Sequence, residues 1–496
     1  MSTASRARPL PAAPRNTPAH PPRVPRPAPV GTAPPPEAVT ALHGAPPAPV
    51  EAFWERVRNE GTPLVRPLAR GRGNGGGDGS GGVGGDGDEY AVTFLWRGTP
   101  DTRAVLVVPN KVLDPRDPAR NLMEQVPGTD VWHLTLRMRG DWSATYSLCV
   151  DEGDGPPEAV SPAAAGAPAS TTPDPALPDP ASPGPASPGP ASPGPAYWQW
   201  LRGRGRPDPL NVLPRMPARW GGGELSVVRL PHAPAQEEWE PRPGVPAGTV
   251  TEHLVRSEHL GNERRVWLYT PPGLPRREAR DTAPLPLLVL LDGEMWEPAL
   301  RVSVLLDNLV ADGRIPPVAA VLPESVDNGL RWRELACDER FAAFLTDELL
   351  PWAGESVPIT DDPARTVVAG QSLGGLTAAF AALRAPHRFG NVLSQSGSFW
   401  WPTGTPDDTD DTDGTGTEWL TARVREGEAG DLPVRFDLSA GLQEWVLLPA
   451  HRRLRAALEA RGCEVSYEEF NGGHDYLCWR ARLAEGLVRL LGRPQP

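Results

Sequence analysis

The chain has 496 residues, of which 64 are proline and 52 are glycine, and its formal net charge at pH 7 is −13. This length allows two or three domains, and the negative charge argues against a nucleic-acid partner. The first residues lack the continuous apolar segment of a secretory signal, and no run reaches the ~18 apolar residues of a membrane span. We therefore expect a cytoplasmic protein with no membrane partner and no obligate protein partner.

The N-terminal part alternates low-complexity segments with segments of globular composition. Residues 1–48 are rich in Pro, Ala and Arg and poor in large apolar side chains, so we expect a disordered tail. Residues 49–152 contain short β-type runs such as YAVTFLWRG and VWHLTLRM, which predict a small β-sandwich. Inside it, the Gly/Asp-rich stretch 70–88 is predicted to be a flexible loop. Three copies of ASPGP make 153–196 a semi-stiff Pro/Ala/Ser linker.

The cysteines Cys149, Cys337, Cys463 and Cys478 are scattered, and none belongs to a C-x-x-C pair. Zinc sites and redox motifs normally use such closely spaced pairs. We therefore expect reduced thiols, no protein metal site and no cofactor.

The remaining region, 197–493, is predicted to be an α/β domain. Apolar strand-like runs such as LPLLVLLD, VAAVLP and RTVVAG alternate with helical patterns such as FAAFLTDELLPWAG. That alternation indicates a parallel sheet covered by helices on both faces. The stretch 405–418 is acidic and rich in Gly and Thr, and it is predicted to be a surface insertion.

A candidate nucleophile lies in the stretch VVAGQSLGGLTAAF, where Ser372 is the centre of a G-x-S-x-G pattern. A predicted strand precedes the pattern and a predicted helix, rich in Ala and Leu, follows it. A serine at such a strand–turn–helix junction is the arrangement of a nucleophile elbow. The alternative interpretation is an ordinary Gly-rich turn.

Three histidines follow Ser372, which is the chain order that an α/β hydrolase requires of its general base. His387 is too close in sequence to return to the serine, and His451 lies on a predicted helix beside two arginines, where we expect it to be exposed. His474 lies in a Gly-rich loop between the last strand and the last helix. The carboxyl ends of the strands are the ligand side of an open sheet, so His474 is the predicted base.

The catalytic acid is expected after the strand VRFDLSAG, where Glu444 stands at the strand exit. Its role would be to orient the histidine and stabilise the imidazolium. Asp437 and Asp475 are the weaker alternatives. The oxyanion hole needs two backbone N–H donors, which we assign to Leu373 and Glu294.

Several long blocks resemble the enterochelin (enterobactin) esterase family, namely LVLLDGEMW, RWRELACDERFAAFLTDELLPW, VVAGQSLGGL, RFGNVLSQSGSFWWP and GGHDYLCWR. Upstream, GTPLVRP, VTFLWRG and GTDVWHLTLRM resemble its N-terminal domain. The resemblance implies an α/β-hydrolase of the esterase D type preceded by an early-set immunoglobulin-like β-sandwich. It also implies a cytoplasmic serine esterase that cuts the trilactone of ferric catecholate siderophores, with iron present only as part of the substrate.

The resemblance assigns catalytic roles to the serine, glutamate and histidine already singled out. It also matches Arg331, Trp479 and Arg480 to positions of the substrate pocket. Arg with aromatic faces suits an anionic, planar catecholate. Two alternatives stay open: a carboxylesterase that acts on another acyl or feruloyl ester, and a binding module whose catalytic site has decayed.

Overall fold

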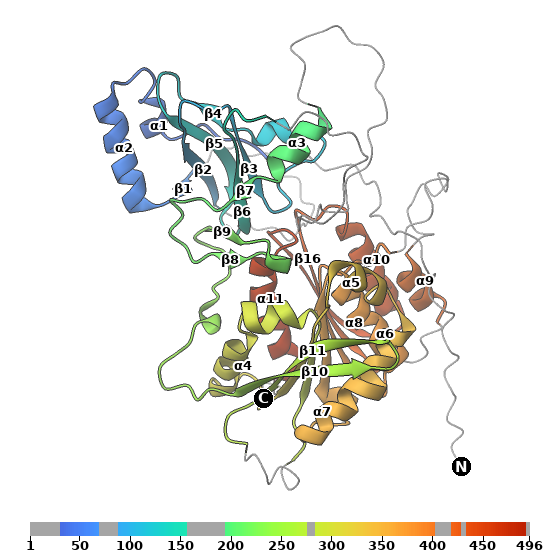
Figure 1. Ribbon diagram of the computed structural model, residues 1–496. Helices are drawn as coiled ribbons and strands as arrows, with labels where there is room; N and C mark the ends of the chain where they lie inside the picture. Colours follow the sequence, from blue (N-terminus) through green and yellow to red (C-terminus); the bar gives the residue numbers. More distant parts are fainter. Residues whose placement is uncertain are drawn as a thin grey trace, which may run out of the picture. The chain divides into compact units, whose positions relative to one another are not determined.

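The computed structural model describes residues 30–68, 88–155, 194–274, 283–401, 418–427 and 433–492 (Figure 1). These residues form two compact units. One unit runs as far as Pro234 and includes the loop Asn471–Leu477, and the other contains Ala235–Phe470 and the C-terminal residues from Cys478.

Most of the predicted low-complexity segments fall outside the described residues. These are the tail as far as residue 29, the Gly-rich loop from 70 to 87, the linker from 156 to 193 and the acidic insertion from 405 to 417.

The first unit is an antiparallel β-sandwich, as predicted. One sheet contains, in spatial order, β1 (Leu64–Pro67), β2 (Glu89–Arg97), β5 (Val131–Arg139) and β4 (Glu124–Gln125). The other contains β3 (Ala104–Pro109), β6 (Ser143–Asp151), β9 (Glu224–Arg229) and β8 (Met216–Pro217), with β7 (Gly205–Arg206) paired to β6. The helical segments are α1 (Glu37–Thr40), α2 (Pro47–Glu60), η1 (Pro118–Asn121), α3 (Pro195–Arg202) and η3 (Arg219–Gly221).

Strand β2 is buried on both faces, which explains its near-continuous apolar sequence. Val92 and Phe94 point into the sandwich core, where they pack with residues of β3, β5 and β6. Leu95 belongs to a second cluster with Trp54 and Val57 of α2. The helix therefore covers the outer face of the sheet, and both faces of β2 contribute apolar burial.

Two segments of the sandwich unit differ from the sequence-based expectation. Residues 30–48 are ordered, because Val39 and Leu42 are buried and Thr32 forms a β-bridge with Leu136. The segment 197–234, which the sequence analysis assigned to the α/β domain, instead completes the sandwich, since β9 and β7 pair with β6. Short strands this far along the chain from their partners carry no local signal of the pairing.

The second unit is built on an eight-stranded sheet. Its spatial order is β10 (Thr249–Ser257), β11 (Asn262–Thr270), β13 (Ala319–Pro323), β12 (Leu287–Leu290), β14 (Thr366–Gln371), β15 (Asn391–Gln395), β16 (Arg435–Gly441) and β17 (Glu464–Phe470). The pairings of β11 with β10 and β13 are antiparallel, and all later pairings are parallel. The sheet is therefore mixed, whereas the residue pattern predicted a parallel one, and it fits the α/β-hydrolase fold that the family resemblance implied.

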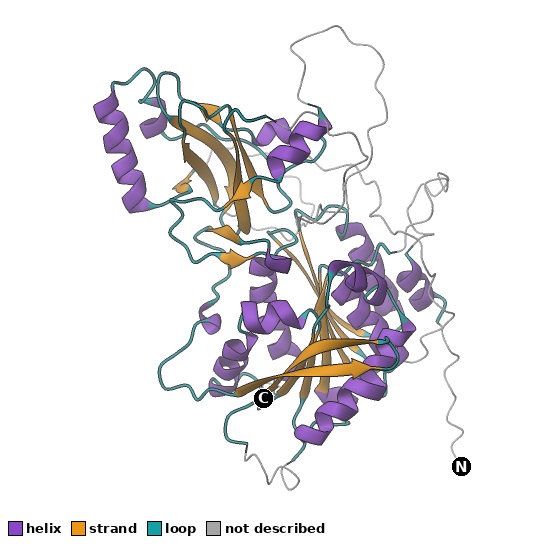
Figure 2. Cartoon of the chain, viewed as in Figure 1, coloured by secondary structure: helices purple, strands orange, loops and turns teal. Residues whose placement is uncertain are grey.

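Helices cover both faces of this sheet (Figure 2). They are α4 (Val302–Ala311), α5 (Asn328–Glu334), α6 (Glu339–Ala343), α7 (Leu350–Ser356), α8 (Leu373–Arg384), α9 (Trp419–Arg425), α10 (Leu448–Ala460) and α11 (Tyr476–Leu491). In Figure 1, α4 and α11 lie on one side of the strands, and α7, α8 and α10 lie on the other. Two π-helical segments, η6 (Met295–Ala299) and η7 (Phe344–Leu349), and two 3₁₀ turns, η4 (Glu237–Trp239) and η8 (Pro363–Arg365), complete the unit.

None of the described helices combines the length and hydropathy needed to cross a membrane. The four cysteines are free, as expected, and all four are buried. Burial raises the pKa of the Cys149 thiol to about 11, so this thiol stays protonated near neutral pH and is a poor nucleophile.

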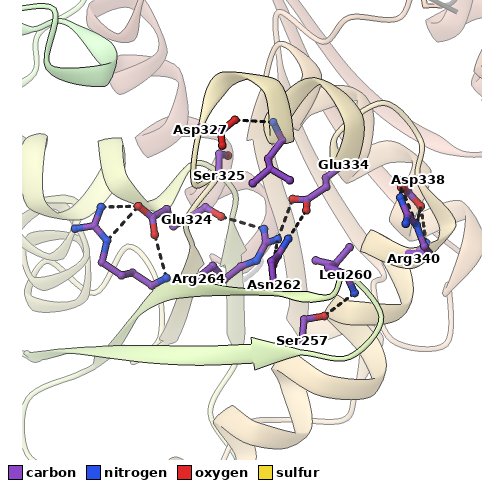
Figure 3. Close-up of polar contacts among 12 residues, drawn as sticks. Ser257, Leu260, Asn262, Arg264, Glu324, Ser325, Asp327, Glu334, Asp338 and Arg340 are labelled. Carbon is purple, nitrogen blue, oxygen red and sulfur yellow. Dashed lines mark hydrogen bonds and ion pairs between the residues drawn. The ribbon is translucent and has the colours of Figure 1, made fainter. Parts of the chain in front are cut away.

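A buried ion pair fixes α5 against β11 (Figure 3). Arg264 Nη2 donates to Glu334 Oε2 over 2.8 Å, and Asn262 Nδ2 donates to Glu334 Oε1 over 2.8 Å. The guanidinium of Arg264 also lies 5.5 Å and 5.0 Å from the ring centroids of Phe341 and Phe344. Both charges are out of water, so each depends on the other for compensation.

Replacing Arg264 with Met should lower the free energy of unfolding by about 3–5 kcal/mol, because Glu334 would remain buried without its counter-charge. Arg455 provides the control, because both side chains of its ion pair with Glu459 are exposed, by 46% and 43%. Arg455→Met should cost about 0–1 kcal/mol. Equal losses in urea denaturation would contradict the account of Arg264.

Candidate active site

Ser372 occupies the turn between β14 and α8 in a conformation that few residues other than glycine adopt. Its φ is 57° and its ψ is −122°. Backbone strain of this kind costs about 1–3 kcal/mol and persists only where the surroundings enforce it. Here the Ser372 amide donates to the Gln395 carbonyl over 3.1 Å, and the Ser372 carbonyl accepts from the Ser398 amide over 2.9 Å. The predicted strand–turn–helix junction is confirmed.

The first glycine of the G-x-S-x-G pattern, Gly370, allows the strand and the helix to approach each other. A Cβ on Gly370 would lie 2.4 Å from backbone atoms of Gly374, which is closer than real Cβ contacts come. A side chain at Gly370 would therefore push the start of α8 away from the strand, and the turn that presents Ser372 would open.

Buried side-chain amides connect the carboxyl ends of neighbouring strands. Trp296 Nε1 donates to Gln371 Oε1, Gln371 Nε2 donates to Gln395 Oε1, and Gln395 Nε2 donates to the Trp479 carbonyl, each over 2.8 Å. Each of the three nitrogen atoms donates to an acceptor, so these hydrogen bonds offset part of the cost of burying the amides. It fixes the elbow relative to β15 and α11.

Arg331 joins the loop after β12 to the elbow. Its guanidinium makes a two-pronged contact with the Asp292 carboxylate, from Nε to Oδ1 over 2.9 Å and from Nη2 to Oδ2 over 2.8 Å. Nη2 also donates to the Gln371 carbonyl over 3.1 Å. Both side chains are buried, and Asp292 has a left-handed φ of 62°. The contact of Arg331 with substrate stays a prediction.

The loop that follows Asp292 carries Glu294, the residue assigned to one oxyanion donor. The Glu294 carboxylate accepts from the Ser325 amide over 3.0 Å, while the Ser325 hydroxyl donates to Asp292 Oδ1 over 2.5 Å. The other assigned donor, Leu373, is the first residue of α8. Backbone N–H groups in the first turn of a helix have no intrahelical partner, which makes this amide suitable for an oxyanion.

Glu444 lies just beyond β16 and is buried. Its Oε2 accepts from the Ser396 hydroxyl over 2.7 Å and from the Gly441 amide over 2.6 Å. The Ser396 hydroxyl accepts in turn from Trp479 Nε1 over 2.9 Å. The carboxylate is therefore held at the edge of the sheet where the strand carrying Ser372 also ends.

The two alternative acids have other partners. Asp437 forms an ion pair with Arg489, with 2.5 Å between Oδ2 and Nε. Asp475 is buried and accepts from the backbone amides of Thr145 and Leu477, over 2.5 Å and 2.9 Å. Burial raises the pKa of Asp475, an effect that these hydrogen bonds oppose.

His474 lies in the loop Asn471–Leu477, between β17 and the body of α11. Its carbonyl accepts from Asn110 Nδ2 over 2.9 Å. A Cβ on Gly473 would lie 2.7 Å from Asn110 Oδ1, so the glycine allows the loop to approach that residue. Asn471 Nδ2 donates to Asp141 over 2.6 Å. The loop that carries the predicted base is thus fixed by side chains of the sandwich unit, of which it is part.

The expectation that His451 is exposed is wrong. Its side chain is fully buried, its ring packs edge-on against Phe399 at 4.8 Å, and its Nδ1 lies 2.9 Å from the Leu447 carbonyl. The adjacent arginines suggested an exposed face, but His451 shares the buried face of α10 with Leu454 and Leu458. His387, by contrast, is exposed beyond the end of α8.

The two C-terminal residues matched to a substrate pocket differ in exposure. Trp479 is buried and donates to Ser396. Arg480 is half-buried, with its guanidinium 4.7 Å from the centroid of the Trp239 ring. Their contacts with substrate remain predictions.

Ser398 is a polar residue at this edge that the sequence reasoning did not single out. Its hydroxyl oxygen lies 3.4 Å from that of Ser372, and the side chain is buried. The available signal was its place after β15, the strand next to the elbow. Among the described residues, no group of three or more His, Cys, Asp or Glu side chains is arranged to hold a metal ion.

Comparisons with known proteins give consistent matches over both units. The family model of the enterochelin esterase N-terminal domain matches residues 91–239, and the esterase family model matches residues 257–490. The iron(III) enterobactin esterase of Dickeya dadantii is 34% identical over 92% of this chain and 97% of its own length. The iron(III) salmochelin esterase of Escherichia coli is 31% identical over 89% of this chain and 93% of its own length.

Solved structures of enterobactin esterases also match most of this chain. The ferric enterobactin esterase of Salmonella typhimurium matches 89% of this chain and 98% of its own, with a TM-score of 0.66 and 30% identity. The enterobactin esterase of Shigella flexneri, crystallised in the presence of enterobactin, matches 89% of this chain and 97% of its own, with a TM-score of 0.65 and 29% identity.

The elbow geometry predicts that a fluorophosphonate probe labels Ser372, because such probes react with activated serines. Mass spectrometry of the labelled peptide checks the position. Ser394→Ala is the matched control, since Ser394 is a buried serine on the adjacent strand, and this variant should label like the parent. Labelling that survives Ser372→Ala would refute the assignment.

Proposed function

We propose that this chain, which belongs to the enterochelin (enterobactin) esterase family, is a serine esterase that hydrolyses the trilactone esters of ferric enterobactin-type catecholate siderophores. The observation that carries the proposal is the strained Ser372 elbow, in a chain that spans 97% of the Dickeya dadantii iron(III) enterobactin esterase. The proposed location is the cytoplasm, where hydrolysis would allow iron release after uptake. Iron takes part only as a component of the substrate.

In the proposed mechanism, Ser372 Oγ attacks an ester carbonyl while His474 removes its proton. Glu444 orients the imidazole and stabilises the imidazolium that forms. When the tetrahedral intermediate collapses, the ester C–O bond breaks and His474 protonates the departing seryl alkoxide. Water then attacks the acyl-enzyme with His474 again as base, which releases the carboxylic acid and restores the Ser372 hydroxyl.

The oxyanion of each tetrahedral intermediate is assigned to the amides of Leu373 and Glu294. The support for this pair is the position of Leu373 at the start of α8 and the anchoring of the Glu294 loop through Asp292 and Arg331. Losing one such donor typically costs about 3 kcal/mol of transition-state stabilisation. Arg331 acts here as a positioning residue, because it holds the loop and the elbow together.

Arg480 is the proposed cation for the anionic catecholate. Its guanidinium already stacks on an indole ring and is half-exposed, and such a planar cation can stack on a catecholate or bind its oxygens. Trp479 is buried. Its proposed contribution is to form part of the wall of the substrate pocket and to donate a hydrogen bond to Ser396.

Purified protein should convert enterobactin, in its ferric or iron-free form, to the linear dihydroxybenzoyl-serine trimer and then to dimer and monomer. Liquid chromatography separates these products. Ser372→Ala should yield none of these products. Its tryptophan fluorescence should still be quenched when ferric enterobactin is added, because the groups that bind the substrate remain. No cleavage of either form by protein whose Ser372 is labelled by the probe would contradict the substrate assignment and leave the nucleophile assignment in place.

A further inference from the structure

We propose that Ser396 is a positioning residue for catalysis. Its hydroxyl accepts a hydrogen bond from the Trp479 indole and donates one to the Glu444 carboxylate, and this pair of hydrogen bonds, the relay, holds the carboxylate in place for the general base. The proposal rests on the proposed function, because it takes Glu444 as the catalytic acid. Ser396, Glu444 and Trp479 all belong to the compact unit that contains the eight-stranded sheet.

The three groups form a continuous buried series. Trp479 Nε1 and Ser396 Oγ are 2.9 Å apart, and Ser396 Oγ and Glu444 Oε2 are 2.7 Å apart. Ser396 is fully buried, and the other two side chains are 2–3% exposed. Water therefore has little access to replace either hydrogen bond, so the loss of one leaves a buried polar atom uncompensated.

The chemistry of the groups fixes the direction of the proton. An indole N–H can only donate, so the Ser396 oxygen must accept from Trp479. The hydroxyl proton is then available to the carboxylate, which accepts it as a charge-assisted hydrogen bond. The Gly441 amide also donates to Oε2. Ser396 and Gly441 thus both donate to Oε2 of Glu444, and we assign Oε1 as the acceptor of the His474 imidazole N–H.

The backbone at Ser396 supports a specific role for its side chain. Its φ is 50°, in the left-handed region that disfavours residues other than Gly, Asn and Asp. The position is held by a hydrogen bond from the Ser396 amide to the Ser439 carbonyl over 2.7 Å. Strained residues that the surroundings hold in place cluster at functional sites, and here the strain aims the hydroxyl at Glu444.

The chain offers matched controls for both donors. Ser394 lies two residues earlier, is equally buried, and its hydroxyl has no hydrogen-bond partner among the described residues. Trp142 is fully buried, and its indole N–H likewise has no such partner in the part of the chain that the structure covers. Ser394→Ala and Trp142→Phe therefore delete the same atoms without breaking a hydrogen bond.

The experiment measures kcat and KM for iron-free enterobactin, with kcat normalised to the sites that a fluorophosphonate probe titrates. Ser396→Ala should lower kcat about 10- to 100-fold, the size expected when a hydrogen bond to a charged group is lost, and should leave KM nearly unchanged. Trp479→Phe should lower kcat in the same direction by a smaller factor. Ser394→Ala and Trp142→Phe should keep the parental kcat.

A variant series with Glu444→Gln separates this proposal from the proposed function. If the relay acts through the carboxylate, Ser396→Ala should add no further loss of kcat in the Glu444→Gln background. Parental kcat in Glu444→Gln would refute Glu444 as the acid and the relay with it. The relay alone would be overturned if Glu444→Gln lost most of its kcat while Ser396→Ala and Trp479→Phe kept the kcat of their control variants.

A merely structural role is also distinguishable. It would lower the melting temperature of Ser396→Ala and the number of titrated sites but not kcat for each titrated site, and that result would overturn the proposal. If Ser396→Ala does not fold, Trp479→Phe carries the test with Trp142→Phe as its control.

Discussion

The structure of the site depends on keeping Ser372 in a backbone conformation that costs free energy. Hydrogen bonds to Gln395 of β15 and from Ser398, just after that strand, hold its amide and its carbonyl. The buried amides of Gln371 and Gln395 fix the two strand ends side by side. A fully satisfied buried network rigidifies its surroundings, whereas a partly satisfied one destabilises them. The strain at Ser372 is therefore maintained by the hydrogen bonds of its own backbone and of the Gln371 and Gln395 side chains.

The same principle organises the loops on either side. The Arg331–Asp292 pair links the loop that carries one assigned oxyanion donor to the carbonyl just before Ser372. A buried ion pair contributes little net stability over a well-packed apolar pair, but it enforces one geometry, because separating the two charges in a dry environment is costly. The Arg264–Glu334 pair has the equivalent effect on α5, the helix that presents Arg331. These two buried ion pairs therefore fix the positions of the elements that surround Ser372.

The sequence predicted those parts of the fold and site that have local signatures. The Ser372 elbow has one, because strand, glycines and helix are contiguous, and so do the doubly buried parallel strands. The pairing of 205–206 and 224–229 with β6, the burial of His451 and the place of Ser396 have none. Each depends on contacts between residues distant in sequence: the arginines beside His451 pointed to solvent, but packing of the whole α10 face decided otherwise. Arg331 and Trp479 were identified through the resemblance, and only the side-chain geometry shows that both contact protein groups.

Catalysis through an ester on Ser372 can be tested by trapping that ester. Protein mixed with iron-free enterobactin can be quenched in acid within milliseconds, digested and mapped by mass spectrometry. Opening a lactone releases no fragment. The peptide that contains Ser372 should therefore gain the mass of one intact trilactone early in the reaction, and the same peptide of Ser372→Ala should gain nothing. Turnover that proceeds with an adduct on another residue, and none on Ser372, would contradict catalysis through that ester.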